Sequence, residues 1–121
     1  MPHLTLEYTN NLTAFDARQV LRACNQALAA TGHFDEADIK SRALSLDTYL
    51  VGIATEERAF IHARLAILSG RPPEIKSQLS AALLPLLHTA CKDIRNCKLQ
   101  LSIEVVDLDR ASYAKEASCR N

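Results

Sequence analysis

The chain has 121 residues, of which 48% are hydrophobic, and its 14 basic side chains balance 14 acidic ones. This length predicts one domain, over residues 1–121, with a core of its own. The balanced charge offers no basic surface for nucleic acid or for an anionic membrane. The sequence does not open with a basic stretch and an apolar run, and no segment reaches the roughly 20 apolar residues of a membrane span, so we expect a cytoplasmic protein.

The spacing of apolar residues predicts six elements in the order strand, helix, strand, strand, helix, strand. Leu4, Leu6 and Tyr8 alternate with polar residues, which indicates a half-buried strand, and the same alternation returns in the three later strands. Apolar residues three or four positions apart mark both helices. The expected ranges are 4–9, 17–31, 39–51, 59–68, 73–90 and 99–105.

Proline, glycine and short polar residues indicate where the helices begin and end. Thr13 followed by Asp16 resembles a capping box for the first helix, and Gly32 supplies its stop. One of two successive prolines suits the first turn of the second helix, where an amide hydrogen has no partner. Pro85 falls inside that second helix, and we expect it to kink or split the helix.

The element order gives two copies of a βαβ unit, over about residues 2–55 and 58–107, followed by a polar tail. We therefore expect an α/β (α+β) fold, in which four strands form one sheet and both helices cover one face. Strands within each unit should be parallel. The other face carries apolar residues such as Phe60, Ala66 and Val106, so we expect other subunits to bury it.

The cysteines and histidines show no spacing typical of metal ligands. The sequence has no C-x-x-C pair and its histidines are scattered singly, so we expect reduced thiols and no metal site. Cys24 lies on the apolar face of the first helix, where a buried hydrophobic residue is expected rather than a nucleophile. The G-x-S-x-G, phosphate-loop and dinucleotide-binding motifs are also missing from the sequence.

Two residues suggest chemistry, and each also has an ordinary explanation. Arg71 follows Gly70 at the bend between the third strand and the second helix. It is either a solvated surface charge or part of a carboxylate receptor, because the adjacent helix terminus presents free N–H groups. Pro2 is either simply the residue after the start or, once Met1 is removed, an amine whose pKa can be lowered until it serves as a base.

Longer runs of residues resemble a known family. Residues 65–76, LAILSGRPPEIK, resemble the strand-G-R-x-x-E-x-K-helix signature of the tautomerase superfamily, whose members use an amino-terminal proline as a base. The resemblance to the 5-carboxymethyl-2-hydroxymuconate isomerase family is more detailed, and it extends from residue 2 to about residue 90 and more loosely to about residue 107. It rests on Met-Pro-His at the start, residues 28–32 (LAATG) with Phe34, residues 39–42 (IKSR), Asp47-Thr48, and Ala59-Phe60 with His62.

The resemblance implies a cofactor-independent isomerase or tautomerase that moves a proton between carbon atoms of a small unsaturated keto or hydroxy polycarboxylate, in aromatic-compound degradation. Pro2 would be the base, and Arg71 would hold a substrate carboxylate or stabilise the developing oxyanion. Lys40 stands where the family has an arginine, and it keeps the charge but not the planar fork. Arg42, on the same side of the strand, would share the substrate binding. The implied assembly is a homotrimer with neither a metal nor an organic cofactor.

Some alternatives stay open at the level of the sequence. A trimer that only binds small anions, or a relative with different chemistry such as hydration, would share most of these residues. A retained Met1 would favour these alternatives, because the nitrogen of Pro2 would then be an amide. His3 has no assigned role, and for Tyr8 and His62 we expect packing or subunit contacts rather than catalysis.

Overall fold

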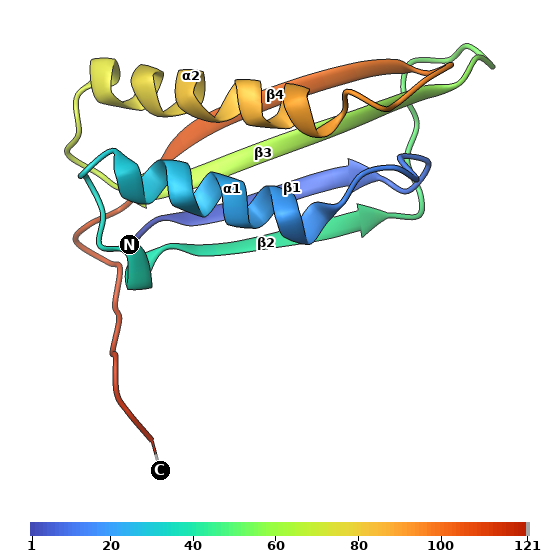
Figure 1. The fold of residues 1–121 in the computed structure, drawn as a ribbon. Coiled ribbons are helices and arrows are strands. Elements are labelled where there is room, and N and C mark those ends of the chain that lie inside the picture. Colours follow the sequence, from blue (N-terminus) through green and yellow to red (C-terminus); the bar gives the residue numbers. More distant parts are fainter. Residues whose placement is uncertain (121) are drawn as a thin grey trace.

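The computed structural model describes residues 1–120 and confirms the predicted α+β class (Figure 1). Its four strands form one sheet in the order β2-β1-β3-β4, and both helices cover the same face of this sheet. A single-turn 3-10 helix, η1, precedes β2. The elements are β1 (His3–Thr9), α1 (Ala17–Ala30), η1 (Glu36–Asp38), β2 (Lys40–Leu46), β3 (Arg58–Leu68), α2 (Pro73–Ala90) and β4 (Lys98–Leu108).

The direction of each strand determines what meets at either end of the sheet. β1 pairs with β2 in parallel, β3 pairs with β4 in parallel, and the central pair β1 and β3 is antiparallel. Parallel pairing within each half confirms the predicted βαβ units. Because of the antiparallel centre, β1 and β2 begin at the same end of the sheet at which β3 and β4 finish.

The core lies between the sheet and the two helices. Alternate residues of β1 and β3 point toward the helices and are almost fully buried, and the helices contribute leucines at helical spacing together with Cys24. Burial raises the pKa of the Cys24 thiol to about 11, so Cys24 packs as a neutral hydrophobic group. The most completely buried apolar side chains are Leu4, Leu6, Leu28, Ile61, Leu65, Ile67, Leu79, Leu83 and Leu87.

The opposite face of the sheet has no covering element among residues 1–120. Phe60, Ala66 and Val106 lie on this open face and remain partly exposed. His62 lies between two β4 residues, with its Nδ1 2.7 Å from Ser102 Oγ and its Nε2 2.5 Å from Glu104 Oε2. The open face therefore combines apolar side chains with a hydrogen-bonded polar group.

Three sequence predictions about element ends are wrong. The cap of α1 is Asp16, whose Oδ1 accepts a hydrogen bond from the amide of Gln19, and Thr13 lies outside the helix. β2 stops at Leu46 instead of continuing to residue 51, because its only partner, β1, ends at the facing residue. β4 continues to Leu108, beyond the predicted residue 105, because β3 offers partners up to that point.

Of the two outcomes expected at Pro85, a kink or a split of the second helix, the split does not occur. α2 is one helix from Pro73 to Ala90, with Pro85 inside it. Proline removes one backbone hydrogen bond. Leu83 and Leu87, two positions before and after it, are both fully buried against the core, and this packing holds the helix together across the lost bond.

Shortening a leucine of the central strand is expected to destabilise the protein strongly. Leu65→Ala removes a side chain that is 0% exposed, and the cavity it leaves should lower the free energy of unfolding by about 2–5 kcal/mol. Leu50→Ala is the matched control, because Leu50 is 77% exposed, and it should change the free energy of unfolding by less than about 0.5 kcal/mol. Urea unfolding at equal protein concentration measures both, and equal effects would contradict the core described here.

Candidate active site

The start of the chain and the Gly-Arg bend lie at the same end of the sheet, as the strand directions require. Pro2 immediately precedes β1 and is fully buried, and its carbonyl accepts a hydrogen bond of 3.1 Å from the amide of Lys40. Gly70 has a φ of +115°, a conformation that favours glycine, and it turns the chain from β3 toward α2. Arg71 is the next residue.

Arg71 is held by the loop that follows α1. Its Nη2 donates a hydrogen bond of 3.1 Å to the carbonyl of His33, and its guanidinium carbon lies 4.9 Å from the centroid of the Phe34 ring. The Nε of Arg71 is shielded from solvent and has no hydrogen-bond partner among residues 1–120. A buried N–H group without a partner is costly, so this position favours a ligand that brings an acceptor oxygen.

A cavity of about 210 Å³ lies beside Arg71, and Pro2, Lys40 and Arg42 are not among its lining residues. Two of its lining side chains, Arg71 and Arg110, are cationic, and two, Asp35 and Asp38, are acidic. Such a volume suits a small ligand, since sites for drug-sized molecules begin at roughly 300 Å³. The lining residues are Met1, Gly32, His33, Phe34, Asp35, Asp38, Leu68, Arg71 and Arg110.

The α-amino group belongs to Met1, which lines this cavity, and its pKa is lowered there. Burial is the largest cause of the lowered pKa, and Lys40, Lys115 and Arg71 contribute in the same direction because a second positive charge is unfavourable beside them. Asp38 acts in the opposite direction and raises the pKa of the amine. An amine with a lowered pKa is more often unprotonated at neutral pH, which is the form that can accept a proton.

The two remaining predicted site residues lie at successive positions on the open face of β2. Lys40 faces His3 in the sheet, and its Nζ donates a hydrogen bond of 2.7 Å to the carbonyl of Asp38. Arg42 lies farther from the cavity, is exposed, and has its Nη2 3.0 Å from Nδ1 of His3. The structure thus brings Pro2, Arg71 and Lys40 together at one end of the sheet, while Arg42 reaches this end only through His3.

The neutral ring of His3 links Arg42 to Tyr113 through two hydrogen bonds. Burial, followed by Arg42 and Lys40, lowers the pKa of its ring. A guanidinium can only donate, so Nδ1 accepts from Arg42 and Nε2 carries the proton. Nε2 lies 2.9 Å from the hydroxyl oxygen of Tyr113, to which it donates. The hydroxyl proton of Tyr113 remains available to another acceptor.

Sequence reasoning missed the contribution of Asp38 and of the chain beyond β4. Arg110 lines the cavity, Tyr113 contacts His3, and Lys115 Nζ lies 2.5 Å from Oδ1 of Asp38. This segment has no periodic pattern, so the spacing of its apolar residues did not predict where it lies. The available signal was weaker: three basic residues at 110–120 follow a strand that should finish near the Gly-Arg bend.

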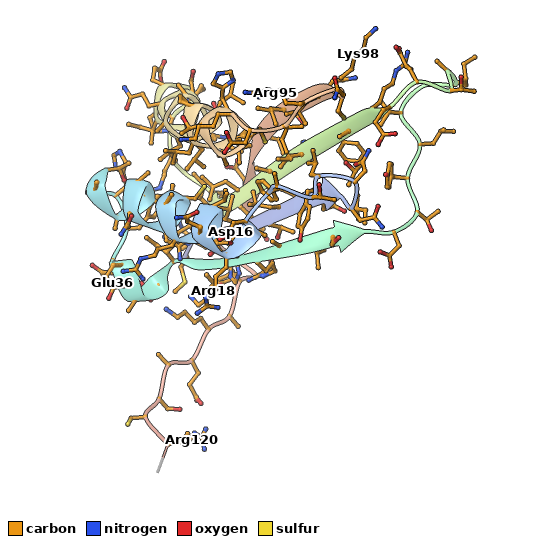
Figure 2. All side chains as sticks on the ribbon, turned by 45° about the vertical axis from the view of Figure 1, so that its right-hand side comes forward. Asp16, Arg18, Glu36, Arg95, Lys98 and Arg120 are labelled. Carbon is orange, nitrogen blue, oxygen red and sulfur yellow. The ribbon has the colours of Figure 1, made fainter. Side chains whose placement is uncertain are left out.

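A larger hollow of about 990 Å³ runs between α1 and the outer edge of β2. Figure 2 shows Asp16 and Arg18 at the start of α1 and Glu36 on η1, which lie along this hollow. None of Pro2, Lys40, Arg42 or Arg71 lines it. The hollow is therefore separate from the site of the predicted chemistry.

The described part of the chain has neither a candidate membrane helix nor a cluster of metal-ligating side chains. Within residues 1–120, no helix combines the length and the hydropathy needed to cross a membrane. Over the same residues, His, Cys, Asp and Glu side chains do not gather in groups of three or more that could hold a metal ion.

Comparison with known proteins gives a consistent result. The family model of 5-carboxymethyl-2-hydroxymuconate isomerase matches residues 2–121. The 5-carboxymethyl-2-hydroxymuconate Delta-isomerase of Escherichia coli is 32% identical over 110 residues, which cover 89% of this chain and 87% of that protein.

Solved structures show the same likeness in three dimensions. A crystal structure of a 5-carboxymethyl-2-hydroxymuconate isomerase from Deinococcus radiodurans R1 matches with a TM-score of 0.89 and 33% identity, covering 97% of this chain and 90% of the other. A fused 4-OT that forms a symmetric trimer matches with a TM-score of 0.67 and 15% identity, covering 93% and 90% of the two chains. At this low identity the second match shows only that the two chains share a fold.

Substitutions around the amine are expected to move its pKa in opposite directions. Arg71→Met removes a cation that lowers the pKa of the α-amino group, so the pKa should rise, and Asp38→Asn should lower it further. Lys98→Met is the control, because Lys98 pairs with Glu56 at the opposite end of the molecule, and it should leave the pKa unchanged (Figure 2). An NMR titration of the α-amino group measures all three, and shifts of the same sign in both site variants would contradict this electrostatic arrangement.

Proposed function

Since this chain belongs to the 5-carboxymethyl-2-hydroxymuconate isomerase family, within the tautomerase superfamily, and is therefore an isomerase, we propose that Pro2 is its catalytic base. The substrate we propose is a small unsaturated keto or hydroxy polycarboxylate, similar in chemistry to the compound in the family's name. Removal of Met1 would turn the amide nitrogen of Pro2 into a secondary amine. The same removal would enlarge the cavity, because Met1 is part of its lining.

The observation that carries the proposal is the electrostatic environment of the chain's start. Burial and three cations, Lys40, Lys115 and Arg71, lower the pKa of the amine there. This amine is the α-amino group of Met1, and Pro2 is the next residue, whose carbonyl accepts a hydrogen bond from the amide of Lys40. We expect the amine of a chain that begins at Pro2 to have a lowered pKa for the same reasons. With a lowered pKa it stays unprotonated down to a lower pH, and catalysis should be lost only as the pH falls through that pKa.

The reaction can be written with the residues at this end of the sheet. The unprotonated nitrogen of Pro2 takes a proton from a carbon next to the substrate's carbonyl group, and the electron pair of that C–H bond moves into a dienolate. Negative charge grows on the carbonyl oxygen, where Arg71 can stabilise it through N–H donors that are already fixed in place. The protonated Pro2 then returns the proton to another carbon atom of the conjugated system, which completes the isomerisation.

Arg71 is suited to this role because its surroundings fix it before a substrate binds. The Phe34 ring and the His33 carbonyl hold two sides of the guanidinium, and Nε is left for an acceptor. A donor that does not reorganise during the reaction stabilises a developing charge better than a mobile one does. Lys40 adds a further cation near the amine, although an ammonium group cannot form the planar bidentate contact that an arginine would make.

We further propose that the protein assembles as a homotrimer through the open face of its sheet. Partly exposed Phe60, Ala66 and Val106, together with Leu44, which is 50% exposed, give this face an apolar component that packing between copies would bury. The trimeric relative of the same fold supports this proposal by analogy.

Processing of the amino terminus is expected to decide activity. A chain that retains Met1 has an amide at Pro2, and its kcat should be about 10²- to 10⁴-fold lower than that of the chain beginning at Pro2, because a general base is lost. Intact mass identifies the two fractions, and the absorbance change of an unsaturated keto dicarboxylate measures their turnover. The fractions differ in nothing else, so equal turnover in both would remove Pro2 from the mechanism.

The molar mass in solution tests the proposed assembly. Light scattering should give three chain masses for the wild type, and Val106→Glu should reduce the mass because it places a charge on the face that becomes buried. Ile53→Glu is the matched control, since Ile53 is 96% exposed in the loop after β2, and it should remain trimeric. A wild-type protein with the mass of one chain would contradict this proposal and leave the assignment of Pro2 untouched.

A further inference from the structure

We infer that the segment that follows β4, residues 109–115, completes the substrate site, with Lys115 as an additional carboxylate-binding residue and Asp38 as the residue that positions it. This inference rests on the proposed function and adds residues that would bind the polycarboxylate substrate. A site with cations from separate segments of the chain suits a ligand that carries at least two carboxylates.

The start of the segment is fixed close to the Gly-Arg bend. Ser69 donates its amide to the carbonyl of Leu108 at 2.8 Å, and the Ser69 carbonyl accepts from Nε of Arg110 at 3.1 Å. The amide of Arg110 also donates to Oγ of Ser69 at 3.1 Å. Ser69 lies two residues before Arg71, so these bonds hold the segment at the edge of the cavity, which Arg110 itself lines.

The middle of the segment is fixed to His3, the first residue of β1. Tyr113 accepts a hydrogen bond from Nε2 of His3, and the ring of His3 is itself oriented by Arg42. Tyr113 is partly buried, whereas its neighbours Ser112 and Ala114 are exposed. The segment therefore runs from Ser69 to His3 and lies next to the first residues of the chain.

Asp38 organises two ammonium groups next to this path. Its carbonyl accepts from Lys40 at 2.7 Å and its carboxylate accepts from Lys115 at 2.5 Å. The side chain of Lys115 is only 23% exposed, although it belongs to an extended tail. Its ammonium group has three N–H donors, and Asp38 uses one of them in this contact. The others can donate to a ligand without breaking the pair.

The pairing also explains why an acidic residue lies in a site for anions. A free lysine side chain has many conformations, and fixing it in one of them costs rotamer entropy. Asp38 restricts the Lys115 side chain before a ligand binds. The hydrogen bond from Lys115 to the Asp38 carboxylate, which lowers the pKa of that carboxyl, indicates this contact. The carboxylate of Asp38 acts as a positioning group, and it opposes the binding of an anion only through its charge.

The cations come from separate segments of the chain, and this arrangement defines the ligand. Arg71 belongs to the β3–α2 bend, whereas Lys40 and Lys115 meet at Asp38, just before β2. All three lie close enough to affect the α-amino group. A dicarboxylate could place one carboxylate at Arg71 and the other at Lys115, with its reactive carbon atoms next to the amine between them.

Calorimetric binding of two saturated acids to the intact, processed protein tests this inference. Adipate carries two carboxylates and hexanoate carries one on a chain of equal length. Lys115→Met should weaken adipate binding about tenfold or more, because a charge-assisted hydrogen bond is lost, and should change hexanoate binding less than about twofold. Lys115→Arg should restore most of the adipate affinity, and Lys98→Met, on a lysine at the opposite end of the molecule, should bind as the wild type does (Figure 2).

Asp38→Asn separates positioning from simple charge. If Asp38 only contributed its negative charge, removing it would strengthen the binding of an anion. If it positions Lys115, adipate should bind several-fold more weakly although the site has become more positive. The two explanations thus predict changes of opposite sign.

Four results would overturn the inference: unchanged adipate binding in Lys115→Met, equal loss of both acids in that variant, tighter adipate binding in Asp38→Asn, or no adipate binding by the wild type. A wild type that binds adipate selectively through Lys115 but shows no difference in turnover between chains with and without Met1 would instead contradict the role of Pro2. The two failures are therefore distinguishable.

Discussion

The antiparallel pairing of β1 with β3 is the constraint on which the whole site depends. It joins two parallel β-α-β halves so that β1 begins where β3 ends. With the central pair parallel, Pro2 and Arg71 would lie at opposite ends of a strand of seven residues, a separation of about 20 Å. The antiparallel register instead places His3 opposite Ala66, five residues before Arg71. The catalytic proposal and the position of the tail both follow from this pairing.

The site is a balance between crowded cations and the contacts that hold them. Like charges in a partly buried place repel one another and lower the pKa of the amine, which favours its role as a base. Fixed partners offset part of this repulsion: Phe34 and the His33 carbonyl for Arg71, and Asp38 for both lysines. A carboxylate of the proposed substrate would offset more of this repulsion by bringing negative charge to the cations.

The sequence predicted the parts of this molecule that depend on local pattern. Alternation in β1 and β3 identified the central strands because one of their faces packs on a hydrophobic core. The family resemblance supplied Pro2, Arg71 and Lys40 as the proposed site residues. The end of β2 was not predictable, since the length of its partner sets it. The contacts of Tyr113 and Lys115 join residues 110 and 77 positions apart in segments without periodicity, and only the folded chain shows them.

The closeness of the chain's start to residues 109–115 has a practical consequence for handling the protein. Under the proposed mechanism, an affinity tag fused before Pro2 would block the catalytic nitrogen and fill the cavity that Met1 lines, so such a preparation would be inactive even when correctly folded. A tag fused after the tail would extend from residues 116–120, which are exposed and point away from the body (Figure 1). Recombinant material with an untouched amino terminus, or with a leader that a protease removes without a scar, is the form on which biochemical measurements have meaning.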